Sequence, residues 1–404
     1  MHSHQISKSS SVTLLYAARG VRGLGDGFAI VLLPAYLTAI GYNATQIGIV
    51  FTASLLGTAL LTLFVGYVAP RHDLQRMLVG GAALMAATGL AFPSFEHIAV
   101  VSMIAFVGSI NPSSGDQGLL VPLEQAMLAR HVSDAARTRA FARYSLVGAL
   151  STAAGSLAAA IPDFFVAAGW GPLAAFKLMF AVYATLGVIA GLLYRRLPHA
   201  RLDEGAPSVA LGPSRGVVYR LAALFSLDAF AGGFTVQSMI ALWLFQRFDL
   251  SLSEASVFFF WSNLLTAFSF PVAAWLAGRI GLVNTMVFTH IPSSAIFILA
   301  AFSPNLWLTL ALLLIRSFLS QMDVPTRTSY VMAVVTPAER TAAASVTAVP
   351  RSLASSISPT LAGMLLSTAF SGMPLVISGT LKIVYDLALL YSFRHIKPPE
   401  EQTR

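Results

Sequence analysis

Apolar residues fill most of this chain in long runs, and short polar segments separate these runs. A helix needs about 20 mostly apolar residues to cross the hydrocarbon core of a bilayer, and twelve of the runs are long enough. We expect transmembrane helices at residues 13–40, 46–69, 77–94, 98–129, 139–161, 172–194, 218–246, 254–278, 282–303, 305–335, 342–368 and 373–393. Because a helix satisfies its backbone hydrogen bonds internally, the pattern predicts an all-α membrane protein.

The longest polar break, residues 195–217, lies at the middle of the chain and contains three prolines. We predict a cytoplasmic linker there, between an N-terminal six-helix bundle at residues 1–194 and a C-terminal bundle with a short tail at residues 218–404. When the halves are superposed, the following pairs coincide: Val324-Pro325 with Val121-Pro122, and Arg340-Thr341 with Arg137-Thr138. The repeat predicts two pseudo-symmetric bundles.

The composition agrees with this class of protein. With 56% hydrophobic and only 10% charged residues, the chain has too few polar residues to cover a soluble globule. It has no cysteine, which excludes disulfides, thiolate metal sites and cysteine nucleophiles. The apolar segment from Val12 to Ile40 is too long for the core of a cleaved signal peptide, so we interpret it as the first transmembrane helix.

Lysine and arginine concentrate in alternate loops, in the central linker and in the C-terminal tail. By the positive-inside rule these segments are cytoplasmic, which predicts a multi-pass protein of the cell (inner) membrane with both termini in the cytoplasm. The net charge of +8 then reflects topology, and we expect no nucleic-acid partner.

Polar residues interrupt the tenth predicted helix. Arg316 is followed by Ser320, Asp323 and Arg327 at i+4, i+7 and i+11, so the four side chains share one face. A charge at the bilayer centre costs at least about 2.5 kcal/mol, so this face must meet protein or a water-filled cavity. Because a guanidinium stays charged and its fork matches a carboxylate or phosphate, Arg316 is the first candidate for binding a substrate.

Two six-helix halves, a central linker, and charged fourth and tenth helices resemble the major facilitator superfamily of secondary transporters. The segment from Gly66 to Arg76 resembles the family's Gly-x-x-x-Asp-Arg-x-Gly-Arg loop, with Pro70 where the family has Asp. Gln117-Gly118 resembles its fourth-helix motif, with Ser114 in place of the Arg. The resemblance implies alternating-access transport of a small solute in the lipid bilayer. We expect a monomer without cofactor or metal ion.

Polar side chains within the predicted helices are the site candidates, because each is costly in lipid. For substrate binding we select Arg316, Arg22, Gln117, Gln237, Arg351 and Ser320. For proton coupling we select Asp26, Asp323, Asp116 and Asp228. The alternative for Asp26 is a structural pair with Arg22 or with a residue of another helix, and Asp323 can instead be held by the arginines on its own face.

Glu124 and Arg327 occupy matching positions in the two halves, so we expect an inter-bundle ion pair that breaks when the protein changes state. The alternative is that both side chains only reach the cytoplasmic interface. Lys382 and Asp386, at i and i+4, predict a structural salt bridge.

Two features of the backbone are predicted as well. Pro112 and Gly115 lie close together and should weaken the fourth helix, which transporters tolerate where backbone lines a cavity. The first helix carries glycines that should let a neighbouring helix approach closely. They are Gly20, Gly23, Gly25 and Gly27.

The leading functional hypothesis is a proton-coupled secondary transporter, and its intramembrane arginines favour an organic anion as substrate. The chain has no nucleotide-binding Gly-x-x-x-x-Gly-Lys motif, so ATP is not the direct energy source. An alternative is proton-coupled efflux of amphipathic or cationic drugs through Asp26, Asp116 and Asp228. A second is a non-transporting receptor on a transporter fold. An intramembrane enzyme is disfavoured, since His290 is the one histidine inside a predicted helix and no metal-binding pattern surrounds it.

Overall fold

The structure is a computed structural model, and it describes residues 2–113, 118–201, 211–336 and 339–396. The regular elements among these residues are helices, and an isolated β-bridge joins Asp73 to Arg201. The described segments that are long and apolar enough to cross a membrane number ten: Ser10–Ala39, Ala44–Val68, Leu74–Ser94, Arg139–Ala167, Pro172–Arg195, Arg215–Phe248, Leu252–Ile280, Leu282–Phe302, Leu306–Val334 and Met373–Phe393. The all-α membrane prediction is confirmed.

The chain forms two compact units. Unit 1 comprises Met1–Glu204 and Gln237–Phe260, and unit 2 comprises Gly205–Val236 and Trp261–Arg404. The helices of unit 1 are α1 (His2–Ala39), α2 (Ala44–Val68), η1 (Ala69–Arg71), α3 (Leu74–Ala91), η2 (Phe92–Ser94), α4 (Ile98–Val107), α5 (Leu120–His131), α6 (Asp134–Ala158), α7 (Ile161–Ala167), α8 (Pro172–Arg195) and α10 (Gln237–Phe248).

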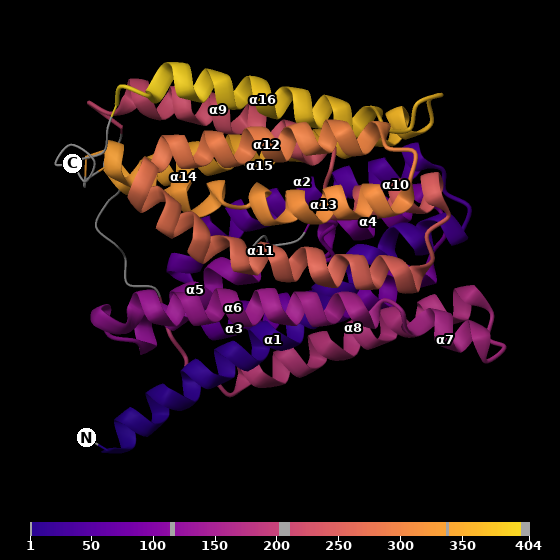
Figure 1. The fold of residues 1–404 in the computed structure, drawn as a ribbon. Helices are drawn as coiled ribbons and strands as arrows, with labels where there is room; N and C mark the ends of the chain where they lie inside the picture. The colour runs from indigo at the N-terminus through magenta and orange to yellow at the C-terminus, as the bar shows by residue number, and fades with distance from the viewer. Residues whose placement is uncertain (1, 114–117, 202–210, 337–338, 397–404) are drawn as a thin grey trace. The chain divides into compact units, whose positions relative to one another are not determined.

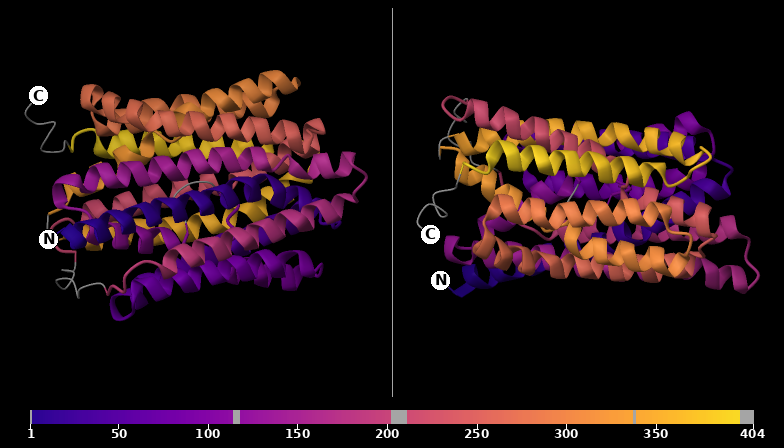
Figure 2. Two further views of the ribbon diagram at one scale, coloured as in Figure 1. Left: turned by 90° about the horizontal axis from the view of Figure 1, so that it is seen from below. Right: turned by 45° about the horizontal axis from the view of Figure 1, so that its top comes forward.

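Unit 2 begins with α9 (Arg215–Gly233), which precedes α10 in the sequence. Helix α11 (Leu252–Ile280) starts in unit 1 and continues in unit 2. The remaining helices of unit 2 are α12 (Leu282–Phe302), α13 (Leu306–Ser320), α14 (Asp323–Val334), α15 (Arg340–Leu366) and α16 (Met373–Phe393). Within each unit the long helices follow a common direction in all the views (Figures 1 and 2).

Three of the predicted transmembrane helices are interrupted. The fourth leaves the helical path after Val107 and resumes at Leu120, as the position of Pro112 predicted; Gly115 lies outside the described residues. The seventh is broken at residues 234–236, between α9 and α10. The tenth is broken at residues 321–322, between α13 and α14. Non-helical backbone at membrane depth is tolerated where it is enclosed by protein or lines a cavity, so we expect these breaks to face away from lipid.

The glycines of α1 perform the role that the sequence predicts. A Cβ added at Gly23 would lie 2.9 Å from Ser151 Cβ, and one at Gly27 would lie 2.8 Å from Ser156 N and closer still to Thr152 O. Helices α1 and α6 therefore pack backbone against backbone (Figure 1). Unit 2 has the equivalent contact, since a Cβ at Gly233 of α9 would lie 2.8 Å from a side-chain atom of α15.

Loops at the helix ends are fixed by side-chain hydrogen bonds. In unit 1, Gln75 Nε2 donates to the carbonyl oxygens of Arg195 and Leu197 at 2.8 Å each. In unit 2, the Glu339 carboxylate accepts hydrogen bonds from the Gly212 amide, from Ser214 Oγ at 2.6 Å and from Thr336 Oγ1. The hydrogen bond from Ser214 is the main cause that lowers the Glu339 pKa to about 2. Residues at both ends of the predicted linker are thus hydrogen-bonded to residues at helix ends.

Candidate functional site

A buried carboxylate in unit 1 gathers donors from three helices. Glu124 of α5 is fully buried and forms an ion pair with Arg22 of α1. Its two oxygens also accept hydrogen bonds from Tyr144 OH of α6 and Tyr194 OH of α8, each at 2.5 Å. A charge in this position is stabilised because three donors, one of them a cation, compensate the loss of water around the carboxylate. The sequence identified Arg22 and Glu124 separately, whereas the two tyrosines carried no signal.

Two further charges lie on α1 beside this pair. The Arg19 guanidinium lies over the Tyr144 ring, 5.3 Å from its centroid. Asp26 lies one turn beyond Arg22 and is half-buried. Arg22 forms its ion pair with Glu124 and not with Asp26. No ion pair or hydrogen bond joins Asp26 to another residue within the described ranges. Asp26 thus differs from Glu124, whose charge is compensated by direct contacts.

Unit 2 contains a larger buried network centred on Asp228 of α9. Asp228 Oδ1 lies 2.7 Å from Lys382 Nζ of α16, and Asp228 Oδ2 lies 3.1 Å from Arg327 Nη1 of α14. Arg327 Nη1 also lies 3.1 Å from Asp323 Oδ2, four residues earlier on α14. All four side chains are buried. The network brings together three sequence-predicted residues, Asp228, Asp323 and Arg327, and clamps both carboxylates with cations.

His290 of α12 extends the network to a third carboxylate. Its Nδ1 lies 3.1 Å from both oxygens of Asp386, and its Nε2 lies 3.4 Å from Lys382 Nζ. The salt bridge predicted between Lys382 and Asp386 is replaced by these contacts, because Asp228 and His290 on neighbouring helices offer each of them a partner. One signal for His290 was present in the sequence, its position as a histidine inside a predicted helix.

Two arginines of unit 2 differ from the residues of this network. Arg316 of α13 lies with its guanidinium carbon 3.8 Å from the centroid of the Phe297 ring. Arg351 lies on α15 and, like Arg316, is half-buried. The buried Nε of each has no hydrogen-bond acceptor among the described residues, and neither arginine forms an ion pair with a described carboxylate. Asp228 and Asp323 act on both arginines through longer-range electrostatic attraction, without forming an ion pair with either. Neither cation is therefore compensated by direct contact with a described carboxylate.

The other predicted residues lie as follows. Ser320 is the last residue of α13 and is buried. Gln237 is the first residue of α10, in unit 1, where the adjacent Ser238 Oγ donates to Ile30 O of α1 at 2.7 Å. Gln117 and Asp116 lie outside the described residues. Among the residues that are described, no group of three or more His, Asp or Glu side chains is arranged to hold a metal ion.

Known proteins resemble the chain over almost its whole length. The sequence model described as Major Facilitator Superfamily matches residues 15–215 and 221–404. A membrane protein of Saccharomyces cerevisiae, YJR124C, is 25% identical over 422 residues, which cover 95% of this chain and 94% of the yeast protein.

Solved transporters share the fold. The nucleoside transporter NupG superposes with a TM-score of 0.75 at 13% identity, covering 95% of this chain and 99% of NupG. The xylose transporter XylE from E. coli gives 0.73 at 12% identity, with 96% and 97% coverage. The human organic anion transporter MFSD10 (TETRAN) gives 0.62 at 18% identity, with 95% and 99% coverage. A family match across both halves and this shared fold lead to one conclusion: the chain is a membrane transporter of the Major Facilitator Superfamily and not an enzyme.

Proposed function

We propose that the chain is a proton-coupled secondary transporter that carries a small organic anion by alternating access. The observation that supports this substrate class is the pair of half-buried arginines without carboxylate partners, Arg316 and Arg351, in a unit where Arg327 and Lys382 are both paired. A cation inside a membrane protein is costly unless an anion compensates it. A bound carboxylate or phosphate would provide that compensation.

The surroundings of Arg316 suit an organic anion better than a small inorganic one. The Phe297 ring covers one face of the guanidinium, so the nitrogen atoms at its edge remain for bidentate hydrogen bonds with a carboxylate or phosphate. Apolar surface next to the cation can contact the organic part of the substrate. Ser320, one turn further along α13, adds a hydroxyl near this position.

For proton coupling we propose Asp26 in unit 1 and the His290–Asp386 pair in unit 2. Asp26 has no cation in ion-pair distance among the described residues, so protonation would break no bond there. His290 and Asp386 share a hydrogen bond and can exchange a proton inside the protein. Asp228 and Asp323 are weaker candidates, because each forms a buried ion pair with Arg327 or Lys382 that a proton would have to break. Asp116 stays a candidate from the sequence.

For gating we propose that Glu124 and Arg327 exchange partners during the transport cycle. Each is ion-paired within its own unit, Glu124 with Arg22 and Arg327 with Asp228. An exchange of this kind would couple the occupancy of the site to the state of the protein.

We further propose that the protein is a monomer in the cell (inner) membrane with both termini in the cytoplasm. A linker at residues 195–217 would connect its two six-helix bundles. The human organic anion transporter that shares the fold is consistent with the substrate class.

The test is substrate uptake by purified protein in liposomes, with a panel of organic anions. Arg316→Ala removes charge-assisted hydrogen bonds of about 1.5–3 kcal/mol each, so we expect at least a tenfold loss of uptake at low substrate concentration. Arg279→Ala is the matched control, because its guanidinium also lies over an aromatic ring, Trp275 at 4.0 Å, but at the end of α11. Equal uptake by the two variants would contradict the proposed site.

Two other outcomes separate the alternative functions. Transport of hydrophobic cations that survives Arg316→Ala would identify a drug exporter. Saturable anion binding without uptake in any lipid composition would identify a receptor on a transporter fold. Either outcome replaces the anion-transport proposal.

A further inference from the structure

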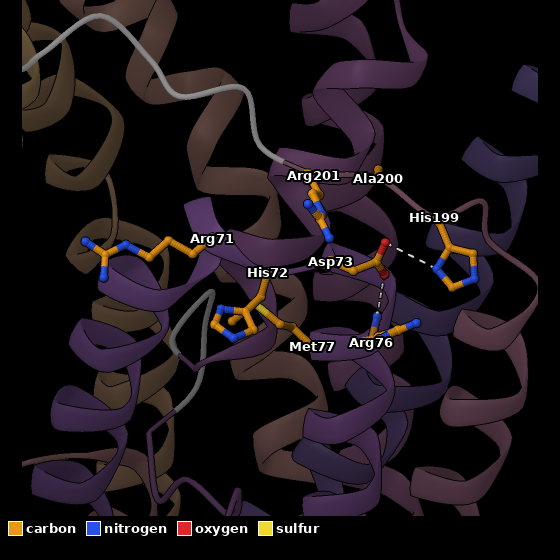
Figure 3. Close-up of a pocket in the computed structure, with 8 residues that line it drawn as sticks. All are labelled: Arg71, His72, Asp73, Arg76, Met77, His199, Ala200 and Arg201. Atoms are coloured by element: carbon orange, nitrogen blue, oxygen red, sulfur yellow. Dashed lines mark hydrogen bonds and ion pairs between the residues drawn. The ribbon is translucent and has the colours of Figure 1, made fainter.

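A pocket of about 550 Å³ lies in unit 1 where α2 ends and α3 begins, and its lining includes no residue of either buried network (Figure 3). Its lining is mostly basic: Arg71, His72, Asp73, Arg76, Met77, His199, Ala200 and Arg201. The proposed transport site uses none of these residues. The pocket stands at the end of a membrane-spanning helix, so its ligand has to be sought near the bilayer surface.

The pocket has a defined backbone frame. Asp73 caps α3 by accepting a hydrogen bond from the Arg76 amide at 3.0 Å. The segment after α8 lies against this cap, since the Leu74 amide donates to Ala200 O at 2.7 Å and Arg201 forms the β-bridge with Asp73. Two segments that are far apart in the sequence thus bring their basic residues to one place.

The charge inside this frame is positive. Arg71, Arg76 and Arg201 contribute three guanidinium groups, and none of them forms an ion pair with a described carboxylate. Asp73 is the single acid of the lining, and its oxygens are engaged by the Arg76 amide and by His199 Nδ1 at 3.2 Å (Figure 3). Partial burial would raise the Asp73 pKa, but these hydrogen bonds outweigh it and lower the pKa. Asp203 and Glu204, which follow Arg201 in the sequence, lie outside the described residues.

An exposed apolar stripe on α2 leads to the pocket. Leu60, Phe64 and Tyr67 recur at i, i+4 and i+7 on one face, and their exposed fractions are 42%, 61% and 69%. Arg71 continues the same face, with its guanidinium 5.2 Å from the centroid of the Tyr67 ring. The basic pocket and the apolar stripe are therefore adjacent, with Arg71 and Tyr67 at their boundary. A phospholipid has the same arrangement, a charged headgroup next to an apolar acyl chain.

We propose that this pocket binds the phosphate headgroup of an acidic phospholipid, whose acyl chain lies along the α2 stripe. Basic pockets at the ends of transmembrane helices are suited to acidic headgroups, and each arginine near the surface strengthens binding of acidic lipid about fivefold. A free phosphate could occupy the guanidinium groups but would make no contact with the stripe, whereas a phospholipid contacts both. The stripe thus favours a lipid over a soluble anion.

The test is native mass spectrometry of the full chain in detergent, titrated with dioleoyl phosphatidic acid. Dioleoyl phosphatidylcholine and glycerol phosphate are titrated in parallel. We expect saturable binding of phosphatidic acid, with weaker binding of the other two. Replacing Arg71, Arg76 and Arg201 together by alanine should weaken phosphatidic acid binding on the order of 100-fold, if the three effects add.

Three further variants make the result specific. Arg215→Ala combined with Arg279→Ala removes two cations that also lie over aromatic rings, outside the pocket, and should leave binding unchanged. The triple variant Arg71→Lys, Arg76→Lys and Arg201→Lys should keep most of the binding and controls for misfolding of the alanine variant. Phe64→Ser with Tyr67→Ser should weaken phosphatidic acid binding and leave glycerol phosphate unaffected.

Several results would overturn the proposal. The alanine variant could bind phosphatidic acid as well as the unchanged protein does, or phosphatidylcholine could bind equally well. Glycerol phosphate binding with the affinity of the lipid would make the site one for a soluble anion. Transport activity is not the readout, so failure here and failure of the proposed function are distinguishable.

Discussion

Replacing Asp228 by asparagine tests the buried network of unit 2 most severely. The substitution keeps the size of the side chain and removes the charge that faces Lys382 Nζ at 2.7 Å and Arg327 Nη1 at 3.1 Å. Arg327 retains Asp323, but Lys382 is left with His290 at 3.4 Å as its neighbour. An unpaired buried cation is the dominant consequence, since Lys382 is only 8% exposed.

The magnitude follows from this burial. Breaking a buried ion pair by removing one partner costs about 3–5 kcal/mol. For a domain the size of unit 2, each kcal/mol lowers the melting temperature by about 2–4 °C, so Asp228→Asn should lower it on the order of 6–20 °C. The assay is thermal unfolding of the purified protein in detergent, followed by the loss of monodisperse protein on size-exclusion chromatography.

A second substitution separates charge from packing. Asp228→Asn combined with Lys382→Met removes both charges, so the double variant should be more stable than Asp228→Asn alone, with a coupling energy of about 0.5–3 kcal/mol. Strict additivity of the two single effects would refute the account of the network. A melting temperature unchanged by Asp228→Asn would refute it as well.

Two other predictions concern packing and pH. Gly27→Ala should destabilise the protein by about 1–3 kcal/mol, because the added Cβ would clash with the α6 backbone. Gly66→Ala is the control and should be neutral or slightly stabilising, since no atom lies within 4 Å of its added Cβ. Equal melting temperatures of the two variants would contradict this prediction. The pKa of Glu339 is about 2 in the folded protein and about 4.3 in the unfolded chain, so its ionised form stabilises the folded state. This contribution to the free energy of unfolding is fully present above about pH 4.3 and is lost as the pH falls toward about 2. The stability gap between the unchanged protein and Glu339→Gln should therefore narrow between pH 6 and pH 3, and a constant gap over this range would argue against it.

Much of the fold was predictable from local pattern. The length of the apolar runs predicted the helices, and Pro112 predicted the break in the fourth one. The glycines of α1 predicted its close packing against α6. The breaks of the seventh and tenth helices were not predicted, although helix-breaking residues flank both. Gly232-Gly233 directly precede the first break, and Pro325 follows the second, where a proline cannot donate to the carbonyl of Gln321 four residues earlier and its ring clashes with it.

The site residues were predictable as a set, but their partners were mostly not. Spacing along one helix predicted the shared face on which Asp323 meets Arg327, at i and i+4. Pairs between helices, such as Arg22 with Glu124, depend on which helices are neighbours and how each is rotated about its axis. A sequence pattern does not contain this information. The same reason explains the incorrect pairing of Lys382 with Asp386.

The most direct test of the central claim is proton movement in liposomes that contain the purified protein and a pH-sensitive dye. Organic anions are added to one series, and hydrophobic cations are added to the other. We predict a pH change in the lumen that depends on an organic anion and is lost in both Arg316→Ala and Asp26→Asn, while Arg279→Ala retains it. A pH change that only cations trigger, or one that survives Arg316→Ala, would contradict proton-coupled anion transport through this site.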